Sequence, residues 1–98
     1  MEIHSDINII FGESGIRKEF LNIKLGSEYV MDFILYCCVI KGNVVINVYD
    51  LQVFDLNGKY MTLTDKEHIE IINKIVYKTN YKYDDKKKWH RQERATFN

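Results

Sequence analysis

The sequence predicts an α+β fold: an antiparallel β-meander sheet of about five strands, one amphipathic helix packed on a face of that sheet, and a basic C-terminal extension. Stretches rich in β-branched and aromatic residues follow one another from the N-terminus, and turns that contain glycine separate them. After Leu63 the apolar residues recur at intervals of three and four, which is typical of a helix. The 98 residues suffice for one hydrophobic core.

The first two predicted strands form a hairpin. Residues 7–11 are a short β-branched run, and residues 17–25 end in an alternation of apolar and polar side chains. Residues 12–15 (Gly-Glu-Ser-Gly) have the composition of a turn. They lack the Lys-Ser/Thr ending of a P-loop and join two strands instead of opening a helix. Gly26 begins the next turn, because glycine tolerates the positive φ of a tight reversal.

Residues 28–40 are predicted to be the central strand. Both alternate sets of positions are apolar in their second half, so both faces should be covered there. One helix cannot cover both faces, and a symmetric dimer formed by edge strands or by the second face of this strand is therefore an expectation. Cys37 and Cys38 are adjacent, so their side chains point to opposite faces and do not pair.

The next strand region covers residues 44–56, after a hairpin loop at residues 41–43. Asp50 interrupts the alternation of apolar side chains, and the sequence leaves open whether it marks a bulge within one strand or a bend between two. An Asn-Gly pair follows, which is a strong hairpin signal and predicts a short fifth strand within residues 59–63.

A helix is predicted over residues 65–79. Thr64 and Glu67 have the spacing of a capping box, in which each side chain accepts a hydrogen bond from the backbone N–H of the other. The stripe of isoleucine and valine must pack on the sheet, because so many exposed isoleucines would promote aggregation. Asn80 is expected to end the helix in the left-handed conformation, which closes a domain of residues 1–80.

Residues 81–98 are predicted to form a basic and aromatic extension. The segment carries a net charge of +3, which the neutral total of 14 basic and 14 acidic residues hides. Its cations can neutralise phosphates and its indole can stack on a base, but tryptophan and arginine are also frequent in protein interfaces. The candidate partner-binding residues are Lys86, Lys87, Lys88, Trp89, His90, Arg91 and Arg94.

No pattern of residues predicts catalysis, a bound metal or a cofactor. The three histidines are far apart in the sequence and the two cysteines are adjacent, so the spacings of a zinc site are missing. Asp32, Asp50 and Asp55 leave open a minor alternative, a metal-dependent nuclease with clustered carboxylates. We therefore expect a protein that is not an enzyme and that needs no cofactor.

The sequence also predicts a cytoplasmic protein that does not associate with a membrane. The N-terminus lacks the basic and apolar regions of a secretory signal. The longest apolar run, residues 33–40, is less than half of the roughly 20 residues that a membrane-spanning helix needs.

One segment resembles a pattern that is common in small accessory proteins of tailed bacteriophages: a strand, an Asp-x-x-Gly turn, a short strand and a capped helix. It runs from Val48 through Asp55-Leu56-Asn57-Gly58 and Thr64-Asp65-Lys66-Glu67 to Ile75. The resemblance implies a binding function, since such early or anti-defence proteins commonly act by occupying a host or defence protein. We therefore predict a non-catalytic, phage-encoded protein that binds and modulates or inhibits such a partner in the host cytoplasm. The alternative is a nucleic-acid-binding accessory protein that uses residues 81–98.

Overall fold

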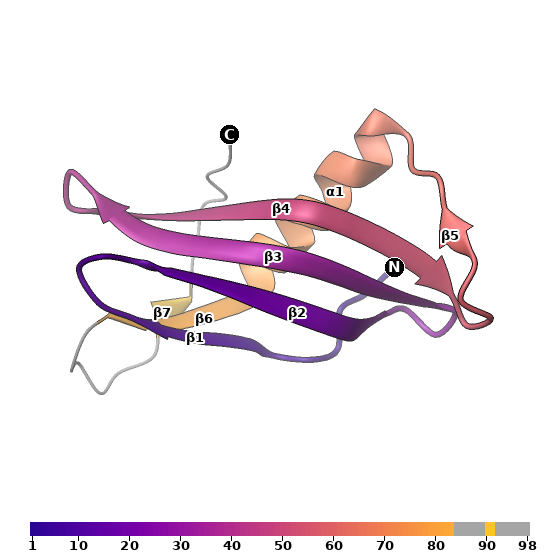
Figure 1. Cartoon of the computed structure of the whole chain (residues 1–98), viewed down its shortest axis with the longest axis horizontal. Coiled ribbons are helices and arrows are strands. Elements are labelled where there is room, and N and C mark those ends of the chain that lie inside the picture. Colours follow the sequence, from indigo (N-terminus) through magenta and orange to yellow (C-terminus); the bar gives the residue numbers. More distant parts are fainter. Residues whose placement is uncertain (84–89, 92–98) are drawn as a thin grey trace.

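Two sheets and one helix make up the part of the chain that the computed structural model describes, residues 1–83 and the backbone of residues 90–91 (Figure 1). One sheet is antiparallel with the strand order β2-β3-β4-β5, and the other has the order β1-β6-β7. The α+β class and the antiparallel meander are thus confirmed. The elements are β1 (Ile7–Phe11), β2 (Ile16–Leu25), β3 (Tyr29–Ile40), β4 (Asn43–Asp55), β5 (Tyr60–Met61), α1 (Asp65–Lys78), β6 (Thr79–Tyr83) and β7 (His90–Arg91).

The predicted hairpin between the first two strands is wrong. β1 pairs with β6 in parallel, from Ile7 opposite Thr79 to Phe11 opposite Tyr83. A parallel pair needs a long crossover connection, and here the whole β2–α1 segment supplies it. The chain therefore returns after the helix to the strand with which it began.

The predicted helix end is also corrected. Asn80 lies in strand β6 and has no positive φ. The helix ends instead at Thr79, whose backbone is extended (φ −79°, ψ 121°). The Thr79 hydroxyl donates to the carbonyl oxygen of Ile75 at 2.8 Å, and the Thr79 N–H donates to Val76, so the end of the helix is satisfied without a left-handed residue. β6 crosses residue 80, where the sequence analysis placed the domain boundary.

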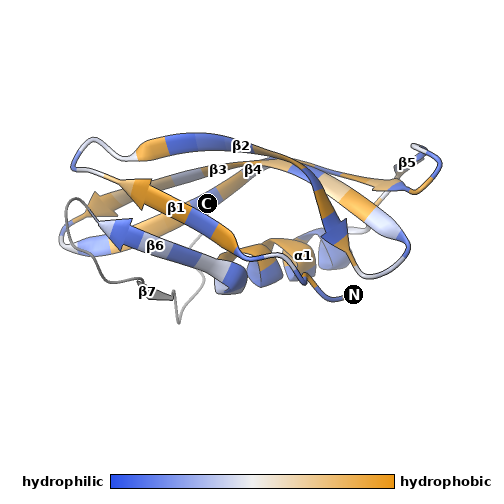
Figure 2. Cartoon of the chain, turned by 90° about the horizontal axis from the view of Figure 1, so that it is seen from below, coloured by the Kyte–Doolittle hydropathy of each residue, from blue (hydrophilic) through white to orange (hydrophobic). Residues whose placement is uncertain are grey.

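The core lies between two layers. Figure 2 shows α1, β1 and β6 together on one side of the β2-β3-β4 sheet. On β3, every second side chain of the first part is buried on that inner side, while the intervening ones are partly exposed. The buried hydrophobic residues are Ile3, Ile7, Ile9, Phe11, Leu25, Met31, Phe33, Leu35, Cys37, Ile46, Leu51, Val53, Ile71, Ile72, Ile75 and Val76.

The strands on the two sides of β3 each contain one bulge, β2 at Asn22 and β4 at Asp50. Asp50 in β4 has φ +52°, and the pairing with β3 shifts there, so residues 43–55 are one strand with a bulge. Asn22 in β2 has φ +55° at a second register shift, and its N–H donates to Oδ1 of Asp32 on β3 at 2.8 Å. Aspartate and asparagine tolerate this left-handed conformation better than most residues, which explains why they occupy the two positions.

The predicted capping box is confirmed. Thr64 Oγ1 accepts from the N–H of Glu67 at 3.2 Å, and Glu67 Oε1 accepts from the N–H of Thr64 at 3.0 Å. We expect Thr64→Ala to lower the free energy of unfolding by about 1 kcal/mol, because it leaves a backbone donor of the first helical turn without its partner. Urea denaturation at pH 7 measures this loss, and Thr62→Ala, an exposed threonine outside the helix, is the control.

The same cap predicts a pH dependence. The hydrogen bonds from Thr64 hold the pKa of the Glu67 carboxyl below its ordinary value of 4.5. A lowered pKa means that the stabilisation is present above pH 4.5 and is lost as the pH falls through the pKa of the folded state. Wild type and Glu67→Gln should therefore differ in stability at pH 7 and converge in acid. A constant difference between pH 7 and pH 3 would contradict this role of the carboxylate.

Candidate functional site

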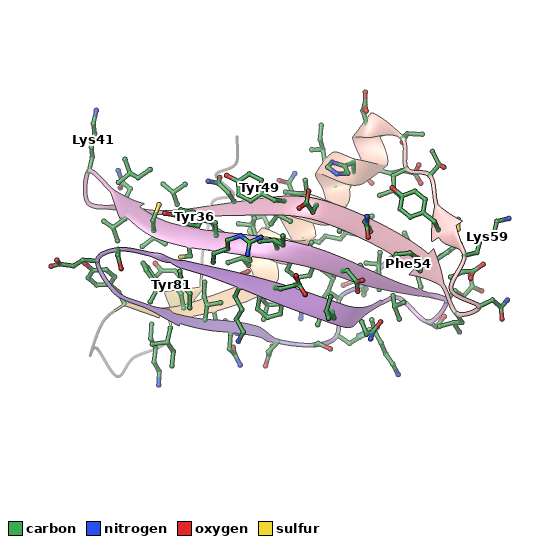
Figure 3. All side chains as sticks on the ribbon, viewed as in Figure 1. Tyr36, Lys41, Tyr49, Phe54, Lys59 and Tyr81 are labelled. Atoms are coloured by element: carbon green, nitrogen blue, oxygen red, sulfur yellow. The ribbon has the colours of Figure 1, made fainter. Side chains whose placement is uncertain are left out.

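The side of the β2-β3-β4 sheet that faces away from α1 carries apolar and aromatic side chains, and no described element covers it. We call it the outer face; Figure 3 looks onto it and labels Tyr36, Tyr49 and Phe54 there. Leu21 is 56% and Tyr49 45% exposed. Further apolar members, each half-buried, are Val30, Ile34, Tyr36, Val45 and Phe54.

Strand pairing brings these side chains together from three segments of the chain. Ile34 at the centre of the outer face lies between Glu19 on β2 and Tyr49 on β4. Tyr36, two residues further along β3, lies between Arg17 and Asn47. The centre of the face is therefore aliphatic and aromatic, and charged side chains of β2 border it.

A shallow hollow of about 280 Å³ opens on the outer face at the level of the two bulges. Carboxylates from three strands line it, Glu19 of β2, Asp32 of β3 and Asp50 of β4, beside the exposed Leu21. The bulges on both sides of β3 bring these groups to the same place, so the hollow is negative and its border is apolar. It is suited to a cationic group that carries apolar neighbours.

The trio of aspartates considered from the sequence is not one cluster. Asp32 and Asp50 share the hollow, whereas Asp55 belongs to the β4–β5 turn. Its Oδ1 accepts from the N–H of Asn57 and from that of Lys59, each at 2.9 Å, so its role is to close the turn. Within residues 1–83, no group of three or more His, Cys, Asp or Glu side chains is arranged to hold a metal ion.

Asn47 on β4 is a polar residue that sequence analysis missed. Its side chain is only 6% exposed, and its Oδ1 accepts no hydrogen bond from the described residues. A buried acceptor without a donor costs about 1–3 kcal/mol. Its register opposite Tyr36 places this unsatisfied group on the outer face. The only signal in the sequence was an asparagine inside a run of valine and isoleucine.

A second hollow, of about 490 Å³, lies between the N-terminal segment and α1. It is lined by Glu2, Glu70, Lys74 and Lys78 together with Tyr77 and other residues, so its charges are mixed. Lys74 Nζ already donates to the carbonyl oxygen of Met1 at 2.6 Å. This hollow lacks the single sign of charge of the hollow on the outer face.

The two thiols differ in their surroundings, as expected for adjacent residues on a strand. Cys37 is buried in the core and Cys38 is half-buried, and both are free. Burial, and after it the neighbouring Cys38, raises the pKa of the Cys37 thiol from 9.0 to about 12. The Cys37 thiol is therefore neutral at physiological pH, and neutral thiols are poor nucleophiles.

We expect iodoacetamide at pH 8 to alkylate Cys38 well before Cys37 in the folded protein, with both modified in urea; peptide mass spectrometry measures the two rates. Because folding raises the pKa of Cys37, its contribution to stability is complete below pH 9.0 and is lost as the pH rises toward about 12. Equal alkylation of the two thiols in the native state would contradict the burial of Cys37.

Most of the partner-binding residues predicted from the sequence, Lys86 to Trp89 and Arg94, lie outside the described residues. His90 and Arg91 form β7, whose backbone pairs with β6 at Tyr81 and Asn80. Their role in binding stays a prediction. In the part of the chain that is described, no helix has the length and the hydrophobicity needed to cross a bilayer.

Comparison with protein-family models, with curated proteins and with solved structures finds no match to this chain. The resemblance to bacteriophage accessory proteins therefore stays a prediction from the sequence.

Proposed function

We propose that the chain is a non-catalytic binding protein whose outer face contacts a protein partner. The observation that supports this function is the exposed apolar surface around Ile34, where Leu21 and Tyr49 are about half accessible to solvent. Monomeric proteins seldom leave a large contiguous apolar patch uncovered, and tyrosine is enriched in protein interfaces. Following the bacteriophage hypothesis, the partner is a host or defence protein that binding inhibits or modulates.

The charges of the outer face indicate the chemistry of the partner. Glu19, Asp32 and Asp50 surround the hollow, and Leu21 lies at its border. An arginine side chain of the partner can enter such a site, because its planar guanidinium forms paired hydrogen bonds with carboxylates. The partner surface is therefore basic at one point and apolar around it.

The test compares two tyrosines that are matched in exposure. Tyr49 on the outer face is 45% exposed and Tyr77 on α1 is 52% exposed. A photo-crosslinking residue placed at each position, in cells that naturally contain the protein, identifies neighbours of the two surfaces. The proposal expects position 49 to give a saturable adduct with a protein other than a second copy of this chain, and position 77 not to give it.

The partner found in this way is then purified, and its affinity for the chain is measured by calorimetry. We expect Tyr49→Ala to weaken binding about 30-fold or more, as for an interface hot spot of at least 2 kcal/mol. Tyr77→Ala should leave the affinity unchanged. Glu19→Gln should weaken binding most at low salt, because screening reduces the contribution of its charge.

Two results would overturn the proposal: equal adducts from positions 49 and 77, or a purified partner whose affinity is insensitive to Tyr49→Ala. Single-stranded oligonucleotides are titrated in parallel. Binding that falls steeply with salt, depends on Trp89 and is independent of Tyr49 would replace the proposal with the nucleic-acid alternative.

A further inference from the structure

One edge of β4 has no pairing strand among the described residues along residues 43–51, and we call it the open edge. β3 pairs with one side of β4, and β5 pairs with the other side only at Val53 and Phe54. No strand of the described chain pairs with that second side before Val53, and Figure 1 shows it as the border of the sheet. Proteins usually protect such an edge with lysine or proline, but residues 43–49 contain no charged residue and no proline.

The hairpin turn indicates which backbone groups face this open edge. Lys41 and Gly42 have φ values of +51° and +79°, as in a type I′ turn with a two-residue loop. Such a loop closes on a hydrogen-bonded pair, here Ile40 and Asn43. Hydrogen-bonded and non-hydrogen-bonded pairs then alternate along the antiparallel ladder, and the residues of the non-hydrogen-bonded pairs direct their backbone groups away from β3. The residues that turn their N–H and C=O groups to the open edge are therefore Val44, Ile46 and Val48.

We propose that a second copy of this chain occupies the open edge, with the two β4 strands antiparallel about a two-fold axis at Ile46. Ile46 then pairs with Ile46 of the second copy, and Val44 pairs with Val48 of the second copy. All the outward backbone groups of the segment are used, in about six hydrogen bonds between the chains. The side chains of these pairs are all β-branched, which favours cross-strand packing.

The charges at the two ends of the segment select this arrangement. Lys41 precedes the uncharged segment and Asp50 follows it. In the proposed register Gly42 lies opposite Asp50 of the second copy, so Lys41 is adjacent to that carboxylate. The two-fold axis repeats this contact at the other end. A parallel arrangement would place the lysines together and the aspartates together, which is unfavourable.

The dimer does not rest on the proposed function. Its two-fold axis runs perpendicular to the sheet, so the outer faces of both copies point to the same side and join into one broader surface. The edge contact brings the second copy beside Asp50 and Tyr49 at the border of the outer face. It leaves Leu21, Ile34 and Glu19 uncovered, and it is therefore compatible with a protein partner at the centre of the face. The proposal is tested on the purified chain alone.

The first experiment measures mass by sedimentation velocity over a range of protein concentrations. We expect the full chain to sediment at twice its 11.7 kDa. Val44→Lys places one lysine of each copy in the contact between the two β4 strands and should weaken association at least 10-fold. Val30→Lys changes a half-buried valine on the outer face of β3, away from the edge, and should not weaken it. Thermal unfolding verifies that both variants fold.

The second experiment tests the register. Asn43→Cys and Tyr49→Cys are prepared as separate proteins, each with Cys38→Ser. In the proposed dimer, position 43 lies opposite position 49 of the second copy with about 4.5 Å between Cα atoms, which permits a disulfide. Two copies of the same variant place their new cysteines about 20 Å apart, at about 3.3 Å per residue.

We expect an equimolar mixture of the two cysteine variants to form several-fold more covalent dimer under mild oxidation than either variant alone. A single species of 11.7 kDa at all concentrations would overturn the proposal. So would equal crosslinking in the mixture and in the separate variants, or a dimer that Val30→Lys weakens as much as Val44→Lys does.

Discussion

Phe33→Ala is expected to lower the free energy of unfolding by about 3–5 kcal/mol, the range for a large aromatic side chain removed from a core. Phe33 is 1% exposed near the middle of the central strand β3. Its ring stacks on that of Phe20, with 5.1 Å between centroids and 18° between planes. Since a whole domain is stable by about 5–15 kcal/mol, this variant should be close to unfolding at room temperature. Urea denaturation followed by circular dichroism measures the loss.

Ile34→Ala is the matched control for Phe33→Ala. Ile34 is the next residue on the same strand, but its side chain lies half-buried on the outer face. We expect Ile34→Ala to lower the free energy of unfolding by about 1 kcal/mol, because the removed atoms are only partly buried and leave no closed cavity. A loss at Ile34 as large as that at Phe33 would mean that both faces are equally covered. That result would contradict the assignment of the outer face.

The second large effect is expected at Gly15, which connects β1 to β2. Gly15 has φ +79°, and a Cβ at this position would lie 2.8 Å from the carbonyl oxygen of Cys37 and 3.0 Å from the Cβ of Cys38. Gly15→Ala therefore adds a clash with β3 to the cost of a left-handed alanine, which is about 1–2 kcal/mol. We expect a total loss of about 3 kcal/mol in the free energy of unfolding, of which the clash supplies about 1–2 kcal/mol.

Gly42→Ala separates the two causes of this loss. Gly42 has the same φ of +79°, but nothing lies within 4 Å of a Cβ added there. This variant should lose only the backbone contribution of about 1–2 kcal/mol. If thermal or urea unfolding shows the same loss for both glycines, the close approach of the β1–β2 connection to β3 is not important for stability.

The elements whose signals are local could be predicted from the sequence. Thr64 and Glu67 lie three residues apart, and the helix begins there as predicted. β2, β3, β4 and β5 follow one another through short connections, so neighbours in the sequence are also neighbours in the sheet. Asp50 was recognised as an interruption, but its φ of +52° was needed to show a bulge within a single strand.

The partner of β1 could not be predicted in the same way. Residues 7–11 have the composition of a strand, but strand propensity does not specify which other strand pairs with them. The preceding turn suggested β2, whereas the chain pairs β1 with β6, 72 positions later in register. Such non-local pairing depends on how the helix packs and on where it returns the chain.

The candidate site was predictable only in part. The sequence showed that β3 is apolar on both sides, and it therefore required one face to meet something other than the single helix. It did not show that β1 and β6 lie on the same side as α1, so that no described element covers the other side. The hollow of Glu19, Asp32 and Asp50 depends on two bulges at the same level of β3, and this alignment appears only when the strands are paired.

By itself, the order of residues determined the kind of each element from β1 to α1, the turns that join β2, β3, β4 and β5, and the start of the helix, because each follows from neighbours a few positions apart. Only the tertiary structure decided which face of the sheet is covered, which strand pairs with β1, and which edge of β4 has no partner among the described strands. These features depend on contacts between segments far apart in the sequence, whose free energy arises only when the layers pack together.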